Sequence, residues 1–102
     1  MQIKISYLSR NIKPTPLFIN FVNEKIAKLQ KILEKHFDEA VLELELFKLK
    51  ELKSDKGTIK VKIILDLKRK KLLSVEAESR SLTVATNKAF KELTRQLEKY
   101  IV

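Results

Sequence analysis

Four basic residues near the C-terminus share one helical face and give the strongest chemical signal in this chain. Lys88, Lys91, Arg95 and Lys99 are spaced three, four and four residues apart. On an α-helix this spacing places their side chains within about 80° of arc. A separate apolar stripe on the same segment comprises Leu82, Ala89, Leu93, Leu97 and Tyr100. Such a helix packs with one face and presents cations with the other, which indicates a polyanionic partner.

An earlier segment repeats the pattern with Lys25, Lys28, Lys31 and Lys35 in a chain of net charge +9. Either helix alone fits an ordinary solvated face. Two basic helices packed side by side would form one broad positive surface, which favours phosphate binding over that alternative. We therefore predict RNA binding by these four lysines together with the four basic residues of the later segment.

A further basic cluster, Lys68, Arg69, Lys70 and Lys71, is predicted to form a charged hairpin turn and a secondary RNA contact. The neighbouring strands carry alternating acids and bases, so their lysines are interpreted as structural. That face also lacks the aromatic side chains with which RNA-recognition-motif sheets stack bases, which argues against that module.

Residues for catalysis or metal binding are scarce. The chain has no cysteine, one glycine and one histidine, His36. A single glycine excludes a glycine-rich phosphate loop, and the missing cysteines exclude disulfides and a thiolate metal site. His36 is expected at the end of the first helix, where its charge would suit the helix dipole. We expect no enzymatic activity, no metal, no cofactor and no small-molecule substrate.

The composition indicates a single charge-rich domain over residues 1–102, with 44% hydrophobic and 34% charged residues. No apolar run approaches the ~20 residues that span a bilayer, and Met1 to Leu8 alternates instead of forming a signal-peptide core. A basic helix could bind an anionic membrane, but its apolar face is needed for the core. We expect a cytoplasmic protein with no membrane partner, monomeric when free.

Hydrophobic periodicity predicts six elements in the order β-α-β-β-β-α. The expected strands are residues 2–8, 40–50, 58–68 and 72–78, and the expected helices are about 16–36 and 82–100. Thr15 and Pro16 suit the N-cap and first turn of the first helix, and Ser79 or Ser81 is expected to cap the second.

Each predicted strand has one apolar and one polar face. The expected buried strand residues are Ile3, Ile5, Leu42, Leu44, Leu46, Val61, Ile63 and Val75, with Tyr7 on the same face as Ile3 and Ile5. They should pack against Phe18, Val22, Leu29, Leu93 and Leu97 of the helices, and the helical period also places Ile26 and Leu33 on the buried face of the first helix. The predicted fold class is therefore α+β, a four-stranded mixed sheet with both helices on one face and its first two strands parallel.

Short motifs along the whole chain resemble the ribosome hibernation-promoting factor and protein Y family of small-subunit interface proteins. The matching residues are Met1-Gln2-Ile3, Phe21-Val22, Lys25-Ile26-Ala27-Lys28-Leu29, Ala77-Glu78, Leu93-Thr94-Arg95-Gln96-Leu97 and Lys99. Because the chain stops after the second helix, it resembles the short members of that family, and a truncated copy of a longer member would look the same.

This resemblance implies a double-stranded-RNA-binding-like fold and a ribosome-binding domain. It implies basic helices that bind small-subunit rRNA in the decoding channel, overlapping the A and P sites. Translation would be inhibited and idle ribosomes preserved in stress and stationary phase. Lys25, Lys28, Arg95 and Lys99 match basic family positions, whereas Glu92 falls where relatives often carry lysine.

Two alternatives belong to other functional classes. A general double-stranded-RNA-binding module needs only a phosphate-binding surface, and a protein-interaction modulator of transcription needs no RNA. Competition between intact small subunits and random duplex RNA would separate the first from a ribosome factor. Protein binding that survives high salt would favour the second.

Overall fold

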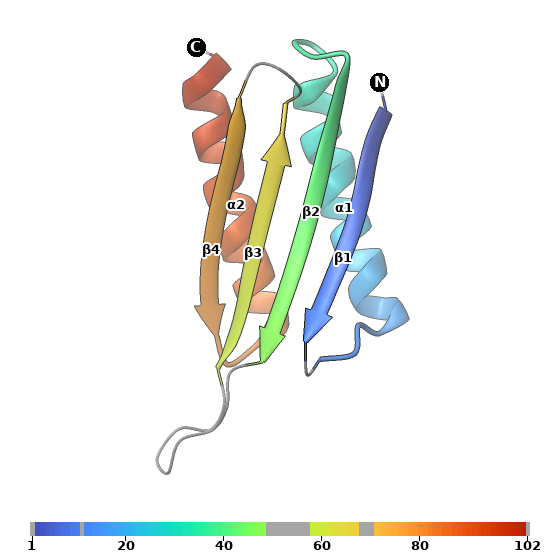
Figure 1. The fold of residues 1–102 in the computed structure, drawn as a ribbon, viewed down its shortest axis with the longest axis vertical. Helices are drawn as coiled ribbons and strands as arrows, with labels where there is room; N and C mark the ends of the chain where they lie inside the picture. The colour runs from blue at the N-terminus through green and yellow to red at the C-terminus, as the bar shows by residue number, and fades with distance from the viewer. Residues whose placement is uncertain (1, 11, 49–57, 68–70, 102) are drawn as a thin grey trace.

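The structure, a computed structural model, describes residues 2–10, 12–48, 58–67 and 71–101. Its elements are β1 (Gln2–Arg10), α1 (Pro16–Leu33), β2 (Glu39–Lys48), β3 (Ile59–Asp66), β4 (Leu72–Ser79) and α2 (Leu82–Ile101). The strands form one sheet in the order β1-β2-β3-β4, and both helices cover the same face (Figure 1). The predicted α+β fold class and element order are confirmed.

The strand register aligns the apolar faces that the sequence predicted. β1 runs parallel to β2, and the other neighbouring pairs are antiparallel. Leu44 lies opposite Tyr7 on one side and Ile63 on the other, so the inward-facing residues continue from strand to strand. The parallel pair requires a crossover connection, which α1 supplies on the covered face.

The buried core lies between the sheet and the helices and includes every strand position predicted for β2, β3 and β4. Leu42, Leu44, Leu46, Val61 and Ile63 are fully buried. From α1 the core receives Phe18, Val22, Ile26, Leu29 and Leu33, as the helical periodicity predicted. The described part of the chain contains no helix long and apolar enough to cross a membrane.

The expected burial of β1 is wrong in part. Ile3 is half-buried, but Ile5 and Tyr7 are 39% and 37% exposed although they face the helix side. The reason is that β1 is an edge strand with only β2 beside it, so solvent reaches these side chains from the open side. Partial burial nevertheless raises the pKa of the Tyr7 hydroxyl above its ordinary value.

The first helix begins as predicted but ends earlier. Thr15 is the N-cap, and its hydroxyl oxygen accepts a hydrogen bond of 3.2 Å from the Phe18 N–H. The helix ends at Leu33, whose carbonyl accepts from the N–H groups of both His36 and Phe37. His36 therefore lies in the turn after the helix and not at its end as predicted, because the chain turns there and packs Phe37 against the core.

The second helix is capped by Ser81, one of the two predicted residues. Its hydroxyl oxygen accepts from the Val84 N–H at 3.3 Å. Ala89, Leu93 and Leu97 are buried as predicted, whereas Tyr100 is 38% exposed at the last turn. The helix also buries residues that the apolar stripe did not include, namely Ala85, Thr86 and Phe90.

Candidate nucleic-acid interface

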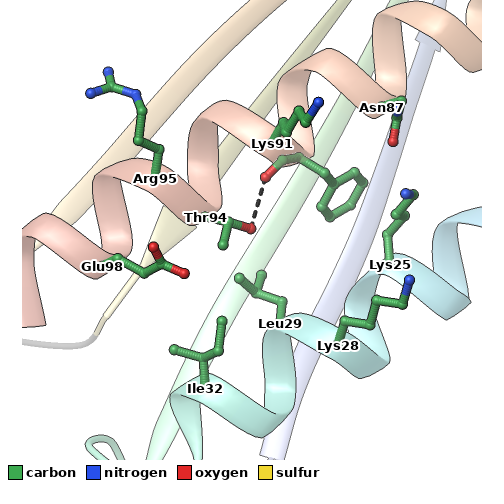
Figure 2. A pocket seen from close by; sticks show the side chains of 10 residues that line it. Lys25, Lys28, Leu29, Ile32, Asn87, Lys91, Thr94, Arg95 and Glu98 are labelled. Carbon is green, nitrogen blue, oxygen red and sulfur yellow. Dashed lines mark hydrogen bonds between the residues drawn. The ribbon is translucent and has the colours of Figure 1, made fainter.

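A groove of about 350 Å³ runs between α1 and α2 on the side of the helices away from the sheet core (Figure 2). We call it the inter-helix groove. α1 lines it with Lys25, Lys28, Leu29 and Ile32, and α2 lines it with Asn87, Phe90, Lys91, Thr94, Arg95 and Glu98. On both helices the spacing is that of a single face, with neighbours three or four residues apart.

The floor of the inter-helix groove is apolar because the core continues into it. Leu29 and Phe90 are only 2% and 4% exposed, and Ile32 is half-buried. The hydroxyl of Thr94 donates a 2.9 Å hydrogen bond to the Phe90 carbonyl, which occupies the donor of its side chain within the helix. Polar side chains thus lie along the rim of the inter-helix groove, and apolar side chains form its floor.

The rim carries four cations and one carboxylate, that of Glu98. Lys25, Lys28 and Lys91 form no ion pair with any residue that the structure describes. The Lys25 ammonium instead lies 5.3 Å from the centre of the Phe21 ring, a cation–π contact that leaves its charge available. Uncompensated cations in a concave surface concentrate positive potential and attract phosphates.

Arg95 differs from the three lysines because it already has an acidic partner. Its Nε donates to the Oε2 of Glu92 at 2.9 Å, and its Nη2 donates to Oε1 of the same carboxylate. Hydrogen bonds from Arg95 and, next, from Gln96 lower the pKa of Glu92 to about 2, and the same pairing raises the pKa of Arg95. Figure 2 shows the guanidinium directed away from α1, at the outer rim of the inter-helix groove.

The structure brings together half of the basic residues predicted on the helices. Lys25, Lys28, Lys91 and Arg95 share the inter-helix groove. The other residues lie elsewhere: Lys31 and Lys88 are exposed outside it, Lys35 lines a neighbouring depression with His36, and Lys99 lines another with Lys71. The predicted stripe on α2 is therefore divided, with Lys91 and Arg95 in the inter-helix groove, Lys99 in another depression and Lys88 in neither.

Of the predicted basic hairpin, only Lys71 can be placed. Lys68, Arg69 and Lys70 lie outside the described residues. Lys71 is exposed, and its ammonium lies 5.3 Å from the centre of the Tyr100 ring, which stacks on Phe37 at 6.3 Å. Lys71 and Lys99 thus form a small second basic site on the β4 side of α2.

Sequence reasoning missed the uncharged and acidic members of the inter-helix groove. Asn87, Thr94 and Glu98 flank Lys91 and Arg95 at helical spacing, so extending the same face along the segment would have found them. The apolar floor had no such signal, because Leu29 and Phe90 look like ordinary core positions.

On the opposite, outer face of the sheet two lysines pair with one acid of the neighbouring strand. The Lys60 ammonium lies 3.2 Å and the Lys62 ammonium 4.0 Å from carboxylate oxygens of Glu76 on the neighbouring strand. The structural interpretation of these lysines is supported by this geometry.

A family model described as Sigma 54 modulation protein / S30EA ribosomal protein matches residues 5–101. A search of curated proteins found no match. Among solved structures, the crystal structure of the Thermus thermophilus Protein Y N-terminal domain is 24% identical, with a TM-score of 0.74 over 98% of this chain and 99% of that one. A ribosomal subunit interface protein from Coxiella burnetii is 16% identical, with a TM-score of 0.69 over 98% of this chain and 97% of that one. Both likenesses show a shared fold.

Proposed function

Because the chain belongs to the Sigma 54 modulation protein / S30EA ribosomal protein family, we propose that it binds the ribosome and restrains translation. The family is one of ribosome-associated proteins and not of enzymes, in agreement with the sequence. Among the solved structures that share its fold are a protein Y domain and a ribosomal subunit interface protein. Such a protein would act in the cytoplasm, where ribosomes translate.

More specifically, the proposed partner is the rRNA of the small subunit, bound in the decoding channel over the A and P sites. Occupying that channel would exclude tRNA and messenger RNA and so preserve idle ribosomes under stress. The observation that carries this proposal is the inter-helix groove, where three lysines without a described acidic partner lie beside Arg95. Cations of this kind bind phosphates and release counterions, which drives association with RNA.

The two helices have complementary roles in this proposal. Lys25 and Lys28 of α1 and Lys91 of α2 act as point charges toward phosphates along the rim. Arg95 can bind a phosphate with two parallel N–H donors once its guanidinium leaves Glu92. Of the remaining predicted residues, Lys71 and Lys99 would provide a second, weaker contact.

The test is a double charge reversal, Lys28→Glu with Arg95→Glu. Both side chains are exposed, so folding should change by no more than about 0.5 kcal/mol. Affinity for purified small subunits, measured by co-sedimentation, should fall about 100-fold, and inhibition of cell-free translation should be lost.

The matched control is Lys31→Glu with Lys88→Glu. It makes the same charge change on the same two helices but outside the inter-helix groove. It should weaken binding far less. Equal losses in the two double variants would show that net charge, and not the inter-helix groove, controls binding.

The family description also supports a second candidate, a protein contact that modulates transcription, because it names sigma-54 modulation. Such a contact would bury apolar surface and would resist salt. Binding to a protein partner that persists at high salt, with no affinity for small subunits, would favour it.

A further inference from the structure

The inter-helix groove is chemically different at its two ends. Toward the N-terminal part of α2 lie Lys25, Lys28 and Lys91 together with the amide of Asn87 (Figure 2). At the other end Figure 2 shows the Glu98 carboxylate directed into the space between the helices, near Ile32. Between the two ends the floor is apolar. Arg95, which is paired with Glu92, lies on the Glu98 side with its guanidinium directed away from α1. The inter-helix groove therefore has one end with three lysines and one end where the Glu98 carboxylate points into the space between the helices.

Glu98 lines both the inter-helix groove and the neighbouring depression that contains Lys35 and His36. It is exposed, and it forms no ion pair or side-chain hydrogen bond with any residue in the described part of the chain. A carboxylate repels phosphates, so Glu98 disfavours a phosphate in the space between the helices, whereas the outward-directed Arg95 can bind one outside that space. It would instead accept hydrogen bonds from a neutral ligand group with N–H donors.

The apolar lining excludes a phosphate from the middle of the inter-helix groove and suits a flat, weakly hydrated ring. Burying a charged group against Leu29, Ile32 and Phe90 would cost free energy, whereas a nucleobase would bury its face there favourably. The volume of about 350 Å³ is large enough to admit one purine ring system. Only an unpaired nucleotide can place its base in such a site.

We propose that the inter-helix groove binds one unpaired guanine nucleotide of an RNA strand, with its phosphate at Lys25, Lys28 and Lys91 and its Watson–Crick edge at Glu98. Guanine is the base whose N1–H and N2–H donors lie side by side and match the two oxygens of a carboxylate. Adenine, cytosine and uracil do not present that pair of neighbouring donors. This inference rests on the proposed function and adds a base-specific contact to it.

The experiment uses RNA hairpins that differ only in one bulged nucleotide. Fluorescence anisotropy should give the wild-type protein an affinity about tenfold higher for bulged guanine than for bulged adenine, cytosine or uracil, or for the fully paired hairpin. Glu98→Gln should reduce this preference to less than about twofold while leaving the thermal midpoint unchanged. Because it also removes a repulsive charge, the same variant should bind the fully paired hairpin at least as tightly as wild type does.

The matched control is Glu24→Gln, which makes the same charge change on α1 at an exposed position outside the inter-helix groove. It should retain the guanine preference. Equal affinity of the wild-type protein for all four bulges would overturn the proposal, as would a guanine preference that survives Glu98→Gln.

Two further measurements distinguish the guanine contact from the proposed ribosome-binding function on which it rests. Guanosine monophosphate should not displace the guanine hairpin at concentrations near the hairpin Kd, and displacement there would assign the inter-helix groove to a free nucleotide instead of RNA. Small-subunit binding that is lost in Lys28→Glu, Arg95→Glu, without any bulge preference in the wild-type protein, would refute the guanine contact and keep the proposed function. Absence of small-subunit binding by the wild-type protein would refute the proposed function itself.

Discussion

On the outer face of the sheet, Lys60 and Lys62 lie 3.2 and 4.0 Å from Glu76, whereas Lys25, Lys28 and Lys91 in the inter-helix groove have no acidic partner among the described residues. The two regions therefore use the same residue type for different purposes. Paired lysines on a sheet neutralise their neighbours and stabilise the fold by a small amount. Unpaired lysines in a concave surface produce a positive electrostatic potential that an anionic partner can neutralise.

The local sequence explains much of this difference. On adjacent strands, residues that face each other come from different segments, and the register places Lys62 between Glu45 and Glu76. On the helices two of the acids bind other residues. The carboxylate of Glu34 accepts a 3.1 Å hydrogen bond from the Gln30 amide, and Glu92 binds Arg95. The lysines of the inter-helix groove are left without compensation.

The largest expected effect that distinguishes the two regions is that of salt concentration on small-subunit affinity. If four cations of the inter-helix groove neutralise phosphates, affinity for small subunits should fall about 100-fold between about 50 and about 200 mM salt. Replacing Lys28 and Lys91 by alanine should reduce the slope of log affinity against log salt by about two, one for each lost contact. A slope unchanged by these substitutions would place the phosphate contacts on another surface.

Charge reversal on the outer sheet face should affect stability more than binding. In a Lys60→Glu, Lys62→Glu variant the new carboxylates would face Glu45, Glu76 and Glu78 across the strands. We expect a loss of about 1–2 kcal/mol in the free energy of unfolding, measured by urea denaturation, because attraction becomes repulsion. Lys60→Gln with Lys62→Gln, which removes the charges without reversing them, should lose less.

Small-subunit affinity at a temperature where both sheet variants are folded should stay within about threefold of wild type. Lys60 and Lys62 alternate with the buried Val61 and Ile63, so they lie on the face away from the helices. A loss as large as that of the Lys28→Glu, Arg95→Glu pair would remove the distinction between the two faces.

The smallest expected effect concerns Arg95, which is intermediate between the two regions because it is exposed but paired. Glu92→Gln should free its guanidinium and raise small-subunit affinity by about two- to fivefold, measured near pH 7. The folded-state pKa of Glu92, about 2, lies below the ordinary value of 4.5. Stability from the pair is thus present above that ordinary value and is lost as pH falls through about 2.

The pH dependence checks this assignment. The difference in thermal midpoint between wild type and Glu92→Gln should be constant from pH 5 upward and should shrink between about pH 4.5 and pH 2. A difference that varies near pH 7 would mean that another group controls Arg95.

Most of the fold could be predicted from the sequence because its patterns are regular. Strict alternation identified the buried residues of β2, β3 and β4, and the 3.6-residue period identified those of α1. The exceptions are positions whose burial depends on a segment distant in the sequence. Ile5 is exposed because β1 has no outer neighbour. Thr86 is buried despite its hydroxyl, which has no hydrogen-bond partner among the described residues, because its helical position faces the sheet.

The candidate site could be predicted only by residue type. Periodicity within each helix showed that the basic residues avoid the core, and this holds for all eight of those predicted on the helices, because none of them is in the buried class. Which cations meet across the two helices depends on where each helix lies on the sheet. That is why Lys28 and Lys91 share the inter-helix groove while Lys31 and Lys99 do not.

By itself the sequence determined the elements, the one-sided sheet and the separation of basic from apolar helical faces, because each of these follows from spacing within one segment. Only the tertiary structure decided that α1 and α2 enclose a groove with an apolar floor and that Glu98 points between the helices. These features combine side chains from segments distant in the chain, because packing of both helices on the shared sheet sets which of their faces meet.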